Sequence, residues 1–215
     1  MAYNIVLFGD SNTYGYNPLN GRFQNRYSVV LKNLLGEDYN VYEEGQIGRT
    51  TIYRDERPGL CGIDDVLNIV SKYQNINLFV IMLGTNDIKI RNARTIYDVK
   101  NGLNSLINKI NISDKIDEIL IISPILISKD IERLDKEYDY NSYILSRQSS
   151  VAYEEVALKH NCYFFDAKDV AIHGIDGEHM TEESHISLGN ALADYIRQIG
   201  RIYKWNLKLY VYIQI

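Results

Sequence analysis

This chain of 215 residues is 46% hydrophobic and 24% charged, and its formal net charge is −5. That composition is typical of a globular protein, and the length suits a single α/β domain. Lysine and arginine are scattered, which argues against a nucleic-acid surface, and no apolar run reaches the roughly 18 residues of a membrane-spanning helix. The start of the chain lacks the basic and apolar regions of a signal peptide, so we expect a cytoplasmic protein with Cys61 and Cys162 reduced.

Strand-like and helix-like segments alternate along the chain. Apolar runs predict strands at 4–8, 39–42, 78–83, 118–123 and 162–165. Helical spacing predicts helices at 27–35, 63–73, 96–110, in a segment that ends near 159, and at 181–199. The unbroken apolar run 78–83 is typical of a central parallel strand that is covered on both faces. Right-handed crossovers between such strands predict a parallel sheet with helices on both sides.

Two segments depart from this alternation. Residues 130–142 are polar and rich in tyrosine, which predicts a surface loop. In the tail, apolar residues alternate with others, which predicts a strand: Leu207, Leu209, Val211, Ile213 and Ile215. We therefore expect one domain over residues 1–200 and an extension over 201–215, which could be an edge strand, a subunit contact in a homo-oligomer or a disordered end.

Polar residues follow the predicted strands at their carboxyl ends. Ser11 comes after the first strand in Gly-Asp-Ser, Gly48 follows the second, and Asn86 follows the third in Gly-Thr-Asn-Asp. Asp176 and His179 come after the fifth. Because the carboxyl ends of parallel strands share one edge of the sheet, we expect these residues to surround one pocket.

Their types suit nucleophilic catalysis. A serine such as Ser11 needs a base, and histidine is suitable because its pKa lies near 7. His179 is favoured as this base because Asp176, three residues earlier, can orient its imidazole. His173 lacks such a partner, and His185 falls inside the last predicted helix, where a packing or solvated role is expected.

A developing oxyanion needs hydrogen-bond donors that are already in place. The backbone N–H groups of Ser11 and Gly48 and the side-chain amide of Asn86 could supply three. Three residues flank these segments and are candidates to line the pocket: Tyr14, Tyr16 and Ile47. The Asp-Gly-Glu-His sequence at 176–179 could contribute to a metal site, but two or three ligands without partners elsewhere make metal binding a poor prediction.

The segments resemble the blocks of the SGNH hydrolases, the GDSL-type esterase superfamily, in the right order over residues 9–185. Ser11 matches the nucleophile, Gly48 and Asn86 the oxyanion-hole positions, and Asp176 with His179 the remaining catalytic pair. Within the superfamily, the sequences at 43–51, 81–87 and 164–167 are similar to bacterial arylesterases with acyltransferase activity. Asn12 and Ser184 depart from residues frequent in the family, which we expect to affect pocket shape.

The resemblance implies a flavodoxin-like three-layer α/β/α sandwich with a five-stranded parallel sheet, and no metal or cofactor. It also implies a serine esterase that acts on small aryl, acetyl or short-acyl carboxylic esters through an acyl-enzyme, with acyl transfer to alcohols. A carbohydrate acetylesterase or a lysophospholipase-type acylhydrolase needs the same groups. From other classes, a flavodoxin-like flavin or nucleotide binder and a non-catalytic binder of the same fold remain as alternatives, although neither explains the paired Asp176 and His179.

Overall fold

The computed structural model describes residues 2–54 and 60–213, with residues 200–213 as backbone only. A parallel sheet of five strands lies at its centre, in the order β4-β1-β5-β6-β7. The strands are β1 Tyr3–Gly9, β4 Tyr39–Gly45, β5 Ile76–Met82, β6 Ile116–Ser123 and β7 Tyr163–Asp166. This confirms the predicted α/β class and the flavodoxin-like strand order.

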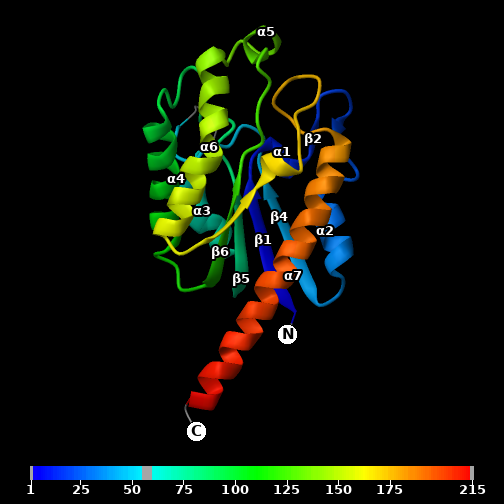
Figure 1. Cartoon of the computed structure of the whole chain (residues 1–215), viewed down its shortest axis with the longest axis vertical. Coiled ribbons are helices and arrows are strands. Elements are labelled where there is room, and N and C mark those ends of the chain that lie inside the picture. The colour runs from blue at the N-terminus through cyan, green and yellow to red at the C-terminus, as the bar shows by residue number, and fades with distance from the viewer. Residues whose placement is uncertain (1, 55–59, 214–215) are drawn as a thin grey trace.

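Helices cover both faces of the sheet (Figure 1). One face carries α2 (Tyr27–Leu35) and α7 (Glu182–Ile213), and the other carries α3 (Gly62–Ser71), α4 (Ile96–Ile110) and α6 (Tyr140–Lys159). Short elements complete the chain: α1 (Ser11–Tyr14), the hairpin of β2 (Tyr16–Asn17) and β3 (Gly21–Arg22), α5 (Ile131–Leu134) and η1 (Ala167–Asp169).

The apolar run in β5 is buried on both faces, as predicted. Phe79 and Ile81 pack into the core beneath α3, α4 and α6. Leu78 and Val80 pack into the opposite core, beneath α2 and α7. Successive side chains of a strand point to opposite faces, so one continuous run supplies both cores. The two layers of helices are thereby held on a single sheet whose carboxyl edge stays free for a site.

The strand predicted in the tail is wrong. α7 continues through residue 200 to Ile213, and Figure 1 shows its last turns running beyond the sheet. Apolar residues also recur there at helical spacing: Ile199, Ile202, Trp205, Leu209 and Ile213. Adding a turn to an existing helix avoids the nucleation cost of a new element. The domain boundary at 200 stays a prediction, and residues 214–215 lie outside the described part.

The surface loop predicted over residues 130–142 is also wrong in part. The segment contains α5 and the first turn of α6, and Asp139 caps α6 by accepting a hydrogen bond from the Ser142 N–H. Ile131 and Tyr138 are fully buried. Tertiary contacts with the core override the polar composition of the segment, so it packs over the edge of the sheet.

The structure also places the two cysteines. Cys162 lies one residue before β7 and is half-buried, and Cys61 is buried, both with free thiols. Among the described residues, no helix is both long and apolar enough to span a lipid bilayer.

His185 is buried where α7 packs on α2. The peptide N–H of Tyr27 donates to its Nδ1 at 3.4 Å, and the rings of Tyr27 and Phe23 lie beside the imidazole. Burial, together with the charges of Arg26 and His179, lowers the pKa of His185 to about 3. The packing role expected for His185 is therefore confirmed, and its protonation is strongly opposed by the fold.

Leu103→Ala and Leu158→Ala make the same change at a buried and at an exposed helical position. Leu103 is 0% exposed in the core under α4, whereas Leu158 is 83% exposed on α6. We expect Leu103→Ala to lower the free energy of unfolding by about 2–5 kcal/mol and Leu158→Ala by less than about 0.5 kcal/mol. Urea denaturation measures both, and equal losses would contradict the assignment of the core.

His185 should make stability depend on pH. Below about pH 6.5 the unfolded chain binds a proton at this histidine, whereas the folded chain binds none until about pH 3. The stability that buried, neutral His185 contributes to the folded state is therefore complete above pH 6.5 and is lost as pH falls. We expect the difference in unfolding free energy between wild type and His185→Gln to shrink by up to about 1.4 kcal/mol per pH unit between about pH 6 and 4. A difference that is constant over this range refutes the burial argument.

Candidate active site

The site begins where β1 turns into α1. Asp10 caps α1, since its carboxylate accepts a hydrogen bond from the Asn12 N–H at 2.9 Å. Burial raises the pKa of Asp10 to about 7, against the lowering effects of Asn12 and His179. Ser11 is therefore the first residue of α1, at the carboxyl edge of the sheet, and it is 4% exposed.

Ser11, His179 and Asp176 form a continuous hydrogen-bonded row. Ser11 Oγ lies 2.9 Å from His179 Nε2, and His179 Nδ1 lies 2.7 Å from Asp176 Oδ2. Asp176 Oδ1 also accepts from the His179 N–H at 3.1 Å, so one carboxylate holds both the ring and the backbone of the histidine. This geometry lets the imidazole take a proton from the serine hydroxyl while Asp176 fixes its orientation.

Neighbouring charges shift the pKa values of His179 and Asp176 in opposite directions. Burial lowers the pKa of His179, but the hydrogen bond to Asp176 and the charges of Glu178, Asp176 and Asp10 outweigh it and raise the pKa overall. For Asp176, burial acts upward, while hydrogen bonds with His179 and the charge of that ring hold the pKa below its usual range. The pair therefore favours a charged carboxylate that stabilises an imidazolium.

Asn12 holds the histidine loop against the serine loop. Its Nδ2 donates to the Glu178 carbonyl oxygen at 3.2 Å, and its Oδ1 accepts from the Met180 N–H at 2.9 Å. These two peptide groups flank His179 on either side, and Asn12 is 1% exposed. Asn12 thus fixes the position of His179, which the sequence did not indicate, while its expected effect on pocket shape stays a prediction.

Gly48 lies in a turn that a buried arginine braces. Its φ of 85° favours glycine, and the next residue, Arg49, is 3% exposed. Arg49 donates to the Gly9 carbonyl at 3.0 Å and to Asp65 at 2.9 Å, and its guanidinium lies 4.4 Å from the Phe8 ring centroid. The Gly48 turn is therefore tied to the end of β1, near Ser11.

Asn86 joins the same region from the end of β5. Its amide donates one hydrogen bond to the Arg49 carbonyl at 3.2 Å, which leaves its second N–H for another acceptor. Asp87 braces the loop, because it accepts from the Thr51 N–H at 3.0 Å. Burial raises the pKa of Asp87 to about 6, although its hydrogen bonds with Thr51 oppose this.

The three candidate pocket residues are placed differently. The Tyr16 ring packs on the His179 imidazole, with 4.6 Å between centroids. The Tyr14 ring instead lies 4.1 Å from the Arg22 guanidinium, and Ile47 is 40% exposed beside Gly48. The structure thus brings Tyr16 to His179, while pocket lining by Tyr14 and Ile47 stays a prediction.

A contact between Tyr138 and Glu178, beside His179, was missed from the sequence. Tyr138 donates its hydroxyl hydrogen to Glu178 Oε2 at 2.5 Å, and Glu178 is the residue before His179. The sequence carried no signal for this contact, because 40 positions separate the two residues and Tyr138 fell in the predicted surface loop.

The rival base His173 is half-buried, with Nδ1 3.0 Å from the Gly174 carbonyl oxygen.

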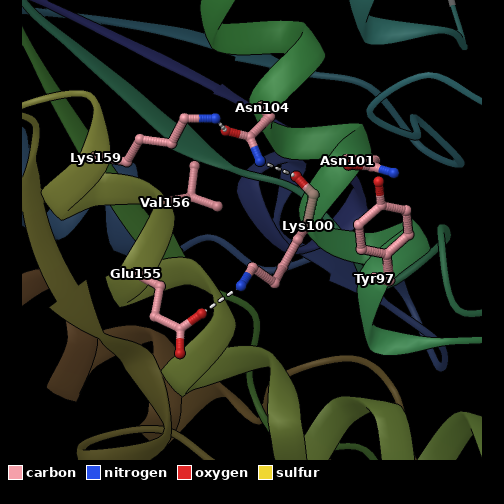
Figure 2. A pocket seen from close by; sticks show the side chains of 7 residues that line it. All are labelled: Tyr97, Lys100, Asn101, Asn104, Glu155, Val156 and Lys159. Carbon is pink, nitrogen blue, oxygen red and sulfur yellow. Dashed lines mark hydrogen bonds and ion pairs between the residues drawn. The ribbon is translucent and has the colours of Figure 1, made fainter.

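A separate hollow lies between α4 and α6, away from Ser11 (Figure 2). It has a volume of about 320 Å³ and is crossed by an ion pair between Lys100 and Glu155. Lys159 donates to Asn104 Oδ1 at 3.1 Å on the same surface. Figure 2 shows Lys100 paired with Glu155 and Lys159 bonded to Asn104. Ser11 and His179 do not line this hollow, so it is separate from the Ser11 row.

Comparisons with known proteins point to one family. The model of the GDSL-like lipase/acylhydrolase family matches residues 7–185. One crystal structure, 33% identical, superposes with a TM-score of 0.88 over 93% of this chain and 99% of its own. A carbohydrate acetylesterase from Sinorhizobium meliloti is 28% identical, with a TM-score of 0.84 over 92% of this chain and 99% of its own.

The aryl esterase of M. smegmatis is 30% identical and superposes with a TM-score of 0.81, over 92% of this chain and 99% of that chain. No curated protein sequence gave a significant match. The family match covers most of the chain, and the solved structures extend the likeness over nearly all of it. The chain therefore belongs to the GDSL-like lipase/acylhydrolase family.

Proposed function

We propose that the protein is a serine esterase that hydrolyses small carboxylic esters through an acyl-enzyme on Ser11. The observation that carries this proposal is the 2.9 Å contact between Ser11 Oγ and His179 Nε2, with Asp176 on the far nitrogen of the ring. Serine becomes nucleophilic only when a base removes its proton, and this contact supplies the base. A flavin or nucleotide binder has no need of such a row.

Each residue then has a defined task. His179 takes the hydroxyl proton as Ser11 Oγ attacks the ester carbonyl, and it passes that proton to the departing alcohol. Water, activated by the same imidazole, then attacks the acyl-enzyme and releases the acid. Asp176 keeps Nδ1 protonated and stabilises the imidazolium that forms in both steps.

The oxyanion is assigned to three donors. The Ser11 N–H is at the start of α1, where helical N–H groups lack intrahelical acceptors. Gly48 contributes its N–H from the turn braced by Arg49, and Asn86 contributes its second amide N–H. Donors held in place before the reaction are worth about 3–4 kcal/mol each to the transition state.

Small acyl groups are the best supported substrates. An aryl esterase and a carbohydrate acetylesterase are among the similar structures, and Ser11 and His179 are only 4% and 8% exposed. A sheltered acyl-enzyme also favours transfer to an alcohol over hydrolysis when an alcohol is present. Carbohydrate acetylesterase activity is therefore the first alternative, while a lysophospholipase-type activity requires room for a long acyl chain.

Ser11→Ala and His179→Ala test the nucleophile and the base. Either change should lower kcat for a small aryl ester such as 4-nitrophenyl acetate by about 10³-fold or more, because the two residues act as one unit. His173→Ala is the matched control, since this half-buried histidine lies outside the row and should keep its activity. Circular dichroism checks folding, and full activity in a folded Ser11→Ala variant rejects the proposal.

A panel of 4-nitrophenyl esters from acetate to decanoate tests the substrate class. We expect kcat/KM to fall with acyl length, with Ser11→Ala as the blank, because a sheltered serine leaves little room for a long chain. A competing alcohol should divert part of the acyl group into a new ester, which chromatography detects. A rise in kcat/KM toward decanoate would instead favour the long-chain acylhydrolase.

A further inference from the structure

A second carboxylate faces the imidazole nitrogen that Asp176 binds. Glu178 Oε1 lies 3.8 Å from His179 Nδ1, and Asp176 Oδ2 lies 2.7 Å from the same atom. The Glu178 side chain is 13% exposed, so water screens its charge only partly. One carboxylate is sufficient to orient a catalytic histidine, so the mechanism above leaves this glutamate without a role.

Glu178 is held at both ends. The fully buried Tyr138 donates its hydroxyl hydrogen to Oε2 at 2.5 Å, which leaves Oε1 as the oxygen nearer to His179. At the backbone, Asn12 donates to the Glu178 carbonyl at 3.2 Å, and the Glu178 N–H donates to Asp176 at 3.3 Å. Hydrogen bonds therefore hold both the backbone and one carboxylate oxygen of Glu178, which fixes the position of its side chain.

Charges around Glu178 partly offset its burial. Burial raises the pKa of Glu178 above its usual range, and Asp135 adds to this, while His179, the Tyr138 hydroxyl and Lys89 act in the opposite direction. Lys89 lies 5.4 Å from the centroid of the Tyr138 ring. Both the hydroxyl and the cation therefore favour the ionised form of the glutamate.

The surroundings of His179 are dominated by acidic groups. Asp176 and Glu178 lie on its own loop, Asp10 comes from the end of β1, and the Tyr16 ring covers one side of the imidazole. His185, from α7, is close enough for the charge of His179 to lower its pKa. A change in the charge of Glu178 therefore acts on an imidazole that Asp176 binds and whose pKa the charge of Asp10 also raises.

We propose that Glu178 is a second positioning carboxylate for His179, which Tyr138 holds in place and which takes over Nδ1 when Asp176 is removed. This inference rests on the proposed function of His179 as the base. With Asp176 absent, Oε1 needs to move by about 1 Å to come within hydrogen-bond distance of Nδ1.

The pH profile of Glu178→Gln is the first test. Glutamine can still accept the hydrogen bond from Tyr138 but carries no charge, so the pKa of His179 falls and the acid limb of kcat/KM moves to lower pH, by about 0.5–1 unit. Glu183→Gln removes the same charge from an exposed position in the first turn of α7 and should leave the limb in place. A Glu178→Gln profile that overlies that of wild type overturns the proposal.

A double-mutant cycle tests the takeover of Nδ1. We expect Asp176→Ala to stay well above Ser11→Ala in kcat, and Glu178→Gln to cost at least about tenfold more in the Asp176→Ala background than in wild type. The same factor in both backgrounds means that Glu178 does not substitute for Asp176, and it contradicts the proposal. Circular dichroism confirms that each variant is folded.

An NMR titration separates this inference from the esterase assignment. The histidine signals of the ligand-free protein are followed against pH, and the signal of His179 is identified by its loss in His179→Ala. We expect the pKa of His179 to be lower in Glu178→Gln than in wild type and unchanged in Glu183→Gln. A lowered pKa without Ser11-dependent ester hydrolysis supports the contact but rejects the esterase. Ser11-dependent hydrolysis with an unchanged pKa of His179 supports the esterase but rejects the role of Glu178.

Discussion

The edge of the sheet that carries Ser11 depends on how closely α1 and the ends of β1, β4 and β5 approach one another. A Cβ on Gly9 would lie 2.7 Å from the Met82 carbonyl oxygen, and a Cβ on Gly45 would lie 2.8 Å from the Thr13 carbonyl carbon. Real side chains do not fit at such distances, so only glycine fits at the ends of β1 and β4 without displacing neighbouring backbone. Ser11 is consequently presented at the edge of the sheet and not inside the core, where its hydroxyl reaches His179.

Buried ionisable groups are concentrated at this edge. Burial raises the pKa of Asp10 to about 7 and that of Asp87 to about 6, and Arg49 is almost wholly enclosed. Groups of this kind oppose folding unless hydrogen bonds compensate them, and each of these is bonded to neighbouring backbone. The two apolar cores on either side of the sheet provide the stability that allows such an arrangement. Active sites commonly retain such buried ionisable groups at the expense of stability.

The histidine reaches Ser11 from 168 positions away in the chain. Its pairing with Asp176 is local, because a spacing of three residues in one loop brings carboxylate and ring together, and that spacing was visible in the sequence. The cross-links that place the loop are not local. Asn12 bonds the peptides on both sides of His179, and Tyr138 bonds Glu178 from a segment whose composition predicted an exposed loop.

Sequence alone determined the parallel α/β architecture and the strand ends that carry Ser11, Gly48 and Asn86, because apolar periodicity and turn residues are properties of short segments. It also paired Asp176 with His179. Only the tertiary structure decided that the tail extends α7, that residues 130–142 pack over the edge of the sheet, and that His185 is buried. These outcomes depend on which surfaces meet after the sheet has formed, and contacts between distant segments leave no periodic pattern in the sequence that could reveal them beforehand.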